Sequence, residues 1–467
     1  MKKHHFILLS SLVFLVLFYN ESIGLNLSLF GLTLLLLIVY RNLKEIRSST
    51  SQILVGTSFL SCLAFAWYGD FVSFLAMFFS LTFLQIKVND PYMKMVQSVP
   101  IAILNGFSSS VRIFHFSQWL PERKIGNNYL KILIAYIFIP VLFLGLFFLV
   151  YSFGSNTFSS VFTNYSLDIE FLPLILTTFL GFYISFSFWN YFVPEVFVKF
   201  NHKLDNEFKP EEIKLLNTFH FLDVDFERKS GEITLVLLNI LLLVFIATYN
   251  YEQFFQEVSV AHLSQEIHER VNAIIFSIIM AVGVLLFYFK GGFNFDPKSK
   301  NLKLLAKVWL VLNGILILSA VIKNSEYILH QGLTYKRLGV YAFLGLSVVG
   351  LVCAFIKIQN QKKNAYLFNQ MIWYFYGLIL LCSYFNWGNF ITKYNIAVEK
   401  GTSESFLHRL DYNDAIYLEM YPEGTKHSYY ISYNTFYHFN YKLEKVIEHQ
   451  NESLLSKALY YEMIDVK

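Results

Sequence analysis

Charged residues are scarce in this 467-residue chain: they make up 15% of it, against 55% hydrophobic and 19% aromatic residues. The mean hydropathy is +0.47. A soluble protein of this size needs more charge to cover its surface, so a soluble globular protein is excluded. The alternating polar and apolar segments of about ten residues that form the strands of an outer-membrane barrel are also lacking. The sequence therefore predicts an integral membrane protein built from helices.

Cysteine is equally scarce. Cys62, Cys353 and Cys382 all fall inside apolar runs, where a thiol usually behaves as a small hydrophobic group. Their spacing fits neither a disulfide framework nor a pair of metal ligands. We therefore predict no disulfide and no cysteine metal site.

Catalytic motifs are missing as well. His268 and Glu269 resemble the start of a zinc-protease motif, but Asn272 stands where that motif requires its second histidine. The chain has no glycine-rich phosphate loop and no kinase motif. We therefore predict no metal site, no cofactor and no nucleic-acid partner, and the sequence favours a non-enzymatic role.

Long apolar runs separated by charged connectors are abundant. A helix of about 20 residues crosses a hydrocarbon core of about 30 Å, since each residue adds 1.5 Å. Counting such runs predicts an all-α transmembrane bundle of about eleven spans. The predicted spans are 6–20, 24–40, 51–68, 71–86, 129–153, 171–193, 233–249, 272–289, 304–322, 338–357 and 366–391.

Lysine and arginine gather in alternate connectors, and such residues are retained on the cytoplasmic side. The connectors "ESIG", "YGD" and "GSNTFSSVFTNYSLDIE" contain neither residue, whereas the connectors between them are rich in both. This bias predicts a cytoplasmic N-terminus and, with an odd number of spans, an external C-terminal tail. The predicted organisation is a four-span segment (1–93), a cytoplasmic interfacial or re-entrant segment (94–128), a two-span segment (129–193), a cytoplasmic loop (194–232), a five-span core (233–395) and an external tail (396–467).

Two predicted external connectors do carry charge: "YEQFFQEVSVAHLSQEIHERVN" and "SAVIKNSEYILHQGLTYKRLG". A rim of this composition could bind an anionic headgroup, an oligosaccharide or a protein partner, or relay protons. It could equally hold the ends of the spans together through charge-assisted hydrogen bonds, and both interpretations stay open. The candidate rim residues are His268, Glu269, Arg270, Asn272, Glu326, Tyr327, His330, Thr334, Lys336 and Arg337.

Two asparagines fall inside predicted spans, Asn313 in "WLVLNGILILSA" and Asn386 in "SYFNWGNF". An amide in hydrocarbon is costly unless it is paired, so each is either a contact between helices or part of a polar pathway.

Three stretches together resemble a known family: "ERVNAIIFSIIMAVGVLLFYFKGG", the segment containing "GLTYKRLGVY", and "YFNWGNFITKYNI". They look like the bacterial membrane proteins of domain of unknown function 4173, over residues 264–396. Arg270 departs from the family pattern, which has glycine there. The resemblance implies a multi-pass protein of the bacterial inner membrane and supplies no reaction. The positions that match the pattern are His268, Glu269, Asn272, Asn313, Tyr327, Gly332, Leu333, Thr334 and Arg337.

These observations favour a non-enzymatic sensor or envelope-complex component that lies in the lipid bilayer and binds a ligand, or a membrane or periplasmic protein partner, at its external rim. The alternative is a transporter or channel that moves a small solute or lipid past Asn313 and Asn386. A third hypothesis is a membrane enzyme acting on a lipid or glycan at the periplasmic face, with His268 or His330 beside a carboxylate.

Overall fold

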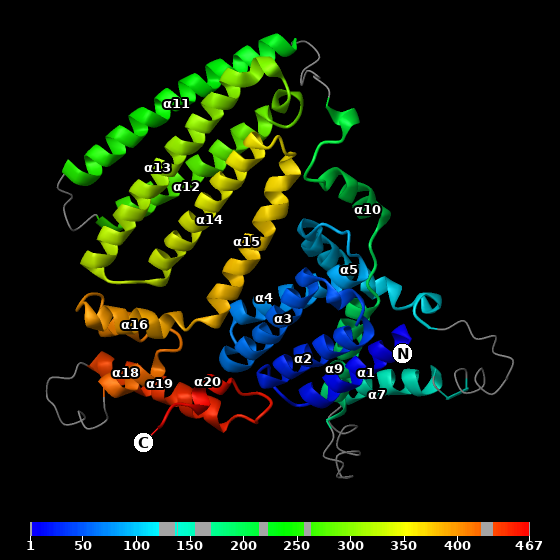
Figure 1. The fold of residues 1–467 in the computed structure, drawn as a ribbon. Coiled ribbons are helices and arrows are strands. Elements are labelled where there is room, and N and C mark those ends of the chain that lie inside the picture. Colours follow the sequence, from blue (N-terminus) through cyan, green and yellow to red (C-terminus); the bar gives the residue numbers. More distant parts are fainter. Residues whose placement is uncertain are drawn as a thin grey trace.

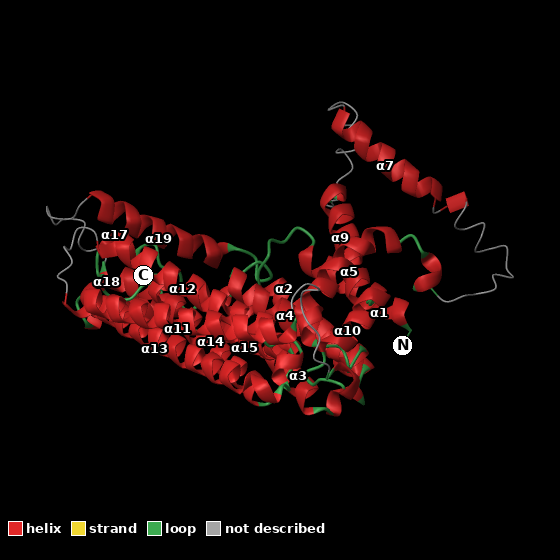
Figure 2. Cartoon of the chain, turned by 90° about the horizontal axis from the view of Figure 1, so that it is seen from above, coloured by secondary structure: helices red, strands yellow, loops and turns green. Residues whose placement is uncertain are grey.

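The computed structural model describes residues 2–120, 136–137, 139–154, 170–213, 223–255, 263–421 and 433–466. Within these ranges the chain forms helices and loops and no strand (Figures 1 and 2). The α-helices are α1 (Lys3–Phe18), α2 (Leu25–Arg41), α3 (Ser49–Tyr68), α4 (Phe71–Asn89), α5 (Ser98–Arg112), α7 (Ile139–Gly154), α9 (Phe171–Trp189), α10 (Glu195–Asn201), α11 (Val224–Phe255), α12 (Leu263–Tyr288), α13 (Lys300–Gln331), α14 (Tyr335–Gln359), α15 (Asn364–Tyr384), α16 (Trp387–Ala397), α17 (Glu404–Leu407), α18 (Asp414–Met420), α19 (Tyr433–Asn451) and α20 (Leu459–Glu462).

Seven helices of the described chain are long and apolar enough to cross a membrane: α3, α4, α9, α11, α13, α14 and α15. The helices α1 and α2 and the segment Ala273–Tyr288 of α12 are apolar but shorter. The expectation of an all-helical, multi-pass membrane protein is confirmed. The count of eleven spans stays a prediction.

Two helices differ from the predicted spans in length. Helix α13 has 32 residues, which makes it about 48 Å long, so its ends extend beyond a hydrocarbon core of about 30 Å. The polar segment that the sequence suggested as a connector is therefore helical as far as Gln331. The last predicted span, 366–391, is interrupted: α15 ends at Tyr384 and α16 begins at Trp387.

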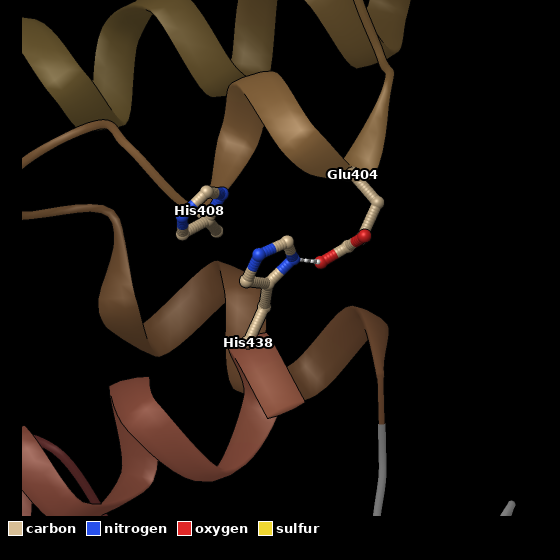
Figure 3. A group of neighbouring side chains, drawn as sticks. All are labelled: Glu404, His408 and His438. Carbon is tan, nitrogen blue, oxygen red and sulfur yellow. Dashed lines mark hydrogen bonds and ion pairs between the residues drawn. The ribbon is translucent and has the colours of Figure 1, made fainter. Parts of the chain in front are cut away.

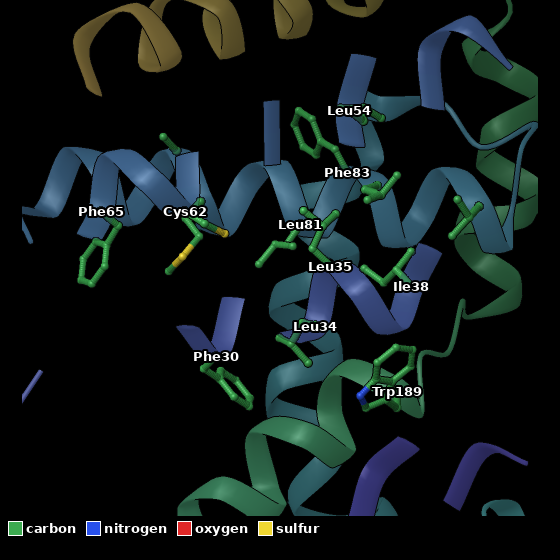
Figure 4. Packing of buried hydrophobic residues seen from close by; sticks show 14 of the residues in the cluster. Phe30, Leu34, Leu35, Ile38, Leu54, Cys62, Phe65, Leu81, Phe83 and Trp189 are labelled. Carbon is green, nitrogen blue, oxygen red and sulfur yellow. The ribbon is translucent and has the colours of Figure 1, made fainter. Parts of the chain in front are cut away.

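One bundle consists of α1–α4, α9 and α15, whose buried side chains share a core (Figure 4). Trp189, at the end of α9, is fully buried in this core and stacks on Phe6 of α1 with 5.0 Å between ring centroids. Its indole N–H donates to Ser10 Oγ at 2.8 Å. The polar edge of the indole is thus satisfied inside the bundle, and α9 is fixed against α1 despite the long sequence separation.

Five hydroxyl groups join α15 to α3 and α4 inside the same bundle. Tyr376 Oη lies 2.7 Å from Ser80 Oγ and donates to Thr57 Oγ1 at 2.8 Å. Ser61 Oγ lies 3.2 Å from Ser80 Oγ and 3.1 Å from Tyr384 Oη. Each hydroxyl has a hydrogen-bond partner, so we interpret this network as a structural contact between helices.

The second bundle consists of α11–α14, which surround a separate apolar core. Asn239 Nδ2 of α11 donates to the Leu305 carbonyl of α13 at 3.1 Å. The buried Lys357 of α14 donates to the Phe289 carbonyl, just after α12, at 2.7 Å. Since α15 contacts α14 on one side and α3 and α4 on the other, it connects the two bundles (Figure 1).

Described residues 385–421 and 433–466, which contain α16–α20, fold against one end of the bundles, and we name them the cap. The backbone N–H of Leu25, at the start of α2, donates to the Lys457 carbonyl at 2.9 Å, and Tyr412 Oη donates to the Tyr68 carbonyl at the end of α3 at 2.9 Å. Asn395 of α16 accepts from the Leu333 N–H at 2.6 Å. The cap thus supplies partners for backbone groups that helix ends leave unpaired.

Two glycines allow this close approach. A Cβ at Gly24 would lie 2.1 Å from the Ser456 carbonyl oxygen, so only glycine admits the cap backbone beside the start of α2. Gly332 ends α13 with φ of +81°, a conformation that side chains disfavour.

We predict that Asn395→Ala loosens the cap. Asn395 is fully buried, and its side chain pairs with both the N–H and the carbonyl of Leu333. Each buried group left unpaired costs about 1–3 kcal/mol. Thermal unfolding and limited proteolysis of the purified protein in detergent should show a lower melting temperature and earlier cleavage within the cap. Lys393→Ala, on the exposed face of the same helix, is the control, and equal behaviour of the two variants would contradict the prediction.

Candidate functional site

The rim residues of α13 and α14 pair with one another. The Arg337 guanidinium lies 4.0 Å from the Tyr327 ring centroid, and its Nη1 donates to the Gly332 carbonyl. Glu326 Oε2 lies 3.1 Å from Lys323 Nζ. The Arg337 contacts tie the end of α13 to the start of α14, whereas the Lys323–Glu326 pair lies within α13.

The other rim residues occupy different positions. Thr334 is the N-cap of α14 and accepts from the Arg337 N–H at 3.3 Å, while His330 and Lys336 are exposed. The side chains of residues 263–272 lie outside the described part of the structure. Whether the two predicted clusters meet therefore stays a prediction for His268, Glu269, Arg270 and Asn272.

The two asparagines assigned to the membrane interior lie in different surroundings. Asn313 is fully buried in the second bundle and donates to the Trp309 carbonyl of its own helix at 2.8 Å. Asn386 lies in the break between α15 and α16, where it accepts from the Asn389 N–H and donates to the Tyr412 carbonyl, both at 2.9 Å. Asn386 therefore acts as a helix cap and as a contact with the tail.

The cap contains a cluster that sequence reasoning missed. Glu404, His408 and His438 each offer one metal-ligating atom, and these atoms all lie within 4.8 Å of one another (Figure 3). Glu404 and His408 come from α17 and the residue that follows it, whereas His438 comes from α19. In the described part of the chain this is the group that could hold a metal ion.

Hydrogen bonds hold the three side chains in place. Glu404 Oε1 lies 2.5 Å from His438 Nδ1 and accepts from Tyr417 Oη at 2.8 Å. His408 Nδ1 lies 3.1 Å from the Ser405 carbonyl oxygen, which can only accept, so this nitrogen carries the proton and Nε2 keeps its lone pair. The two imidazole rings are stacked with 3.7 Å between centroids.

Local electrostatics keep this cluster suited to coordination. Burial and, next, the neighbouring His438 lower the pKa of His408, which favours the neutral imidazole that ligates metals. Burial and the bond to Glu404 raise the pKa of Tyr417, so its hydroxyl remains a donor to the carboxylate. The arrangement presents two imidazoles and a carboxylate, a set of ligands that suits zinc and ferrous iron.

A buried ion pair lies next to the cluster, one helical turn from His438. Lys442 follows His438 by one turn of α19, and its Nζ lies 2.9 Å from Asp414 Oδ1. The same Nζ donates to the Leu410 carbonyl at 2.7 Å and to Asn413 Oδ1 at 2.8 Å. Both charged side chains are at least 98% buried, so this pair joins α19 to the start of α18 away from solvent.

Sequence inspection gave only a weak signal for this cluster. Glu404 and His408 have the i, i+4 spacing that places side chains on one helical face, but exposed pairs of this kind are common. His438 follows thirty positions later, so the three residues meet only after α19 has folded back on α17.

A comparison with known protein families finds a match over residues 5–421. The chain belongs to the DUF4153 family, a domain of unknown function. No curated protein and no solved structure matches the chain. The region that matches DUF4153 includes every predicted span together with Glu404 and His408. His438 and Lys442 lie beyond this region.

This result corrects the resemblance suggested by the sequence. The match is to DUF4153 and extends over most of the chain, whereas domain of unknown function 4173 was expected over residues 264–396 and is not found. The motifs around "GLTYKRLGVY" are short, and an apolar composition shared by many membrane proteins makes such motifs poor at separating families. The coarser expectation, a family defined by a domain of unknown function, is confirmed.

We predict that Lys442→Ala destabilises the cap by about 3–5 kcal/mol, because it leaves Asp414 buried without its counter-charge. Thermal unfolding in detergent and proteolysis of the tail should detect the loss. Adding Asp414→Asn should recover part of the stability, since it removes the uncompensated charge. Glu444→Ala, at an exposed position of α19, is the control, and a loss of similar size there would refute the assignment.

Proposed function

We propose that this member of DUF4153 is a non-enzymatic sensor or envelope-complex component of the bacterial inner membrane, with eleven spans, a cytoplasmic N-terminus and an external cap that binds a ligand. The ligand is a divalent transition-metal ion held by Glu404, His408 and His438. The observation that carries this proposal is the convergence of two imidazoles and a carboxylate in the cap.

The difference between the two ends of the bundles supports the orientation. The turns after α1 and α3, and the turn between α13 and α14, all contact the cap. Lys94, Arg228, Lys362 and Lys363 lie at the opposite end, in ion pairs that connect loops there. Lysine and arginine concentrated at one end favour a cytoplasmic location for that end.

Coordination requires little rearrangement. The 2.5 Å between His438 Nδ1 and Glu404 Oε1 leaves room for a single shared proton, which a metal ion would replace. Ligand atoms around a tetrahedral zinc ion lie about 3.3 Å apart, so the pair must separate by roughly 1 Å while the free nitrogen of His408 approaches. Three protein ligands leave a fourth position for water or for a group from a partner protein.

The transporter alternative has weaker support. Asn313 Oδ1 is buried without a hydrogen-bond partner in the described structure, as a residue of a polar pathway could be. Asn386, however, lies at the cap, bonded to the α16 and Tyr412 backbones. The two residues that the alternative requires therefore occupy separate sites, one in the second bundle and one in the cap junction.

The orientation predicts which introduced cysteines are reachable from outside the cell. In a background with the three native cysteines replaced by serine, a membrane-impermeant maleimide should label Glu448→Cys on α19 in intact spheroplasts. It should label His202→Cys, at the lysine-rich end, only after permeabilisation, since both positions are exposed. The reverse pattern would refute the orientation and leave the metal site untouched.

The metal site predicts one bound equivalent of Zn²⁺ in the full-length protein, purified without a polyhistidine tag and titrated by calorimetry. His408→Ala and His438→Ala should abolish this binding, and Glu404→Gln should weaken it strongly, because the amide lacks the negative charge of the carboxylate ligand. Parallel titration with Fe²⁺ under anaerobic conditions ranks the two ions that suit these ligands.

His115→Ala removes an exposed imidazole far from the cap and serves as the control for nonspecific binding. Stoichiometric binding that persists in the His408→Ala, His438→Ala double variant, or absence of binding in a folded wild-type protein, would refute the site.

A further inference from the structure

Three cations converge at the end of the first bundle opposite the cap. Lys3 begins α1, Arg41 ends α2 and Arg112 ends α5. The positive charges of Arg41 and Arg112 are both close enough to act on Lys3. Among the described residues, no carboxylate forms an ion pair with any of these three side chains.

Asn190, the residue that follows α9, is the centre of this group. Its Oδ1 accepts from Lys3 Nζ at 3.0 Å, and its backbone carbonyl accepts from Arg112 Nη2 at 2.5 Å. The Arg41 guanidinium lies 5.9 Å from the ring of the preceding residue, Trp189. Two of the cations thus contact Asn190 directly, and the third lies over the ring of the residue before it.

The side chain of Asn190 has an unused donor. Asn190 is 1% exposed, and its Nδ2 has no hydrogen-bond partner in the described structure. Turning the amide over would bring its NH₂ group against the Lys3 ammonium, so the chemistry fixes the orientation. A buried N–H donor left unpaired among three cations is the complement of an anionic oxygen.

The helix dipole alone does not account for these charges. The end of α9 carries roughly −0.5 of an elementary charge, and it favours a nearby cation. Three cations exceed that partial charge several-fold. Lys3 and Arg112 are half-buried and Arg41 is exposed, and the mutual repulsion of three converging cations is unfavourable without a counter-ion. The surplus positive charge favours a bound anion.

We infer that a phosphate group binds at this site, contacting Lys3, Arg41 and Arg112 and accepting from Asn190 Nδ2. The site lies where the apolar helix α1 begins at Lys3 and the apolar helix α2 ends at Arg41. Basic residues at the ends of membrane-spanning helices lie at the depth of the lipid headgroups. Basic pockets between spanning helices bind anionic lipid headgroups in this way. The phosphate of an anionic lipid and free inorganic phosphate share this chemistry. The inference does not depend on the cap or on which side of the membrane this end faces.

The test is native mass spectrometry of the full-length protein titrated with phosphatidylglycerol, with phosphatidylcholine, and with inorganic phosphate. We expect selective retention of phosphatidylglycerol, weakened roughly fivefold for each cation removed, and so by about two orders of magnitude in a Lys3→Gln, Arg41→Gln, Arg112→Gln variant. Retention of inorganic phosphate in place of the lipid would identify the free ion as the source.

The matched control removes three exposed cations from the same end that do not converge, Lys44→Gln, Arg47→Gln and Lys199→Gln, and should leave lipid retention unchanged.

A second variant separates binding from folding. Asn190→Asp supplies a permanent carboxylate in the middle of the three cations, so we expect a folded protein, verified by its melting temperature, that retains neither lipid nor phosphate. Retention of phosphatidylglycerol by a folded Asn190→Asp protein at the wild-type level, or equal losses in the triple variant and its control, would overturn the inference.

Discussion

Every helix leaves four N–H groups and four carbonyl groups unpaired at its ends, and in a membrane protein these groups must find partners where the bilayer stops. At one end of this molecule the cap meets that requirement. Carbonyls of the tail accept from the first N–H groups of α2, and a tail tyrosine donates to the last turn of α3. The position of the cap therefore follows from backbone hydrogen bonding, and apolar contacts such as those of Tyr417 and Leu407 add to it.

Among the membrane-spanning helices, the same need to pair polar groups gives polar side chains a structural role. Lipid chains compete with apolar side chains for the surfaces of helices, so hydroxyl and amide groups decide which helices meet and in what register. The hydroxyl network of Thr57, Ser80 and Tyr376 fixes α15 against α3 and α4. Asn239 performs the equivalent task between α11 and α13. With only 15% charged residues in the chain, such neutral polar groups must supply much of the specificity.

The helical class and the approximate positions of the long apolar helices were predictable, because a run of about 20 apolar residues has few other structures open to it. The end of α13 was not, since Lys323, Glu326 and Tyr327 look like loop residues until α13 is known to extend past the hydrocarbon core. The break at Asn386 was missed for a related reason: an asparagine that caps α16 reads, in sequence alone, as a polar residue inside a span.

The candidate metal cluster was beyond sequence reasoning because its formation is a tertiary event. His438 reaches Glu404 only when α19 folds back on α17, and that return depends on Lys442 entering a site made by Asp414, Asn413 and Leu410. The sequence spacing of Lys442 and Asp414 does not predict that they form an ion pair. The polar rim shows the opposite case, since its composition was evident but its contacts are mostly internal, as between Arg337 and Tyr327.

Lysine and arginine concentrate at the end of the molecule opposite the cap, and α15 runs from that end to the cap. At its start, Lys363 pairs with Glu212 at 2.5 Å and Asn369 donates to the Leu204 carbonyl at 2.8 Å, which ties α15 to the loops of the lysine-rich end. At its finish it leads through Asn386 directly into α16 of the cap. Its middle is held to the first bundle by directional hydroxyl contacts, and it meets α14 of the second bundle on its other side. A rearrangement of the cap on binding a ligand would therefore reach the opposite end through α15, because this helix continues into the cap and has polar attachments at both ends.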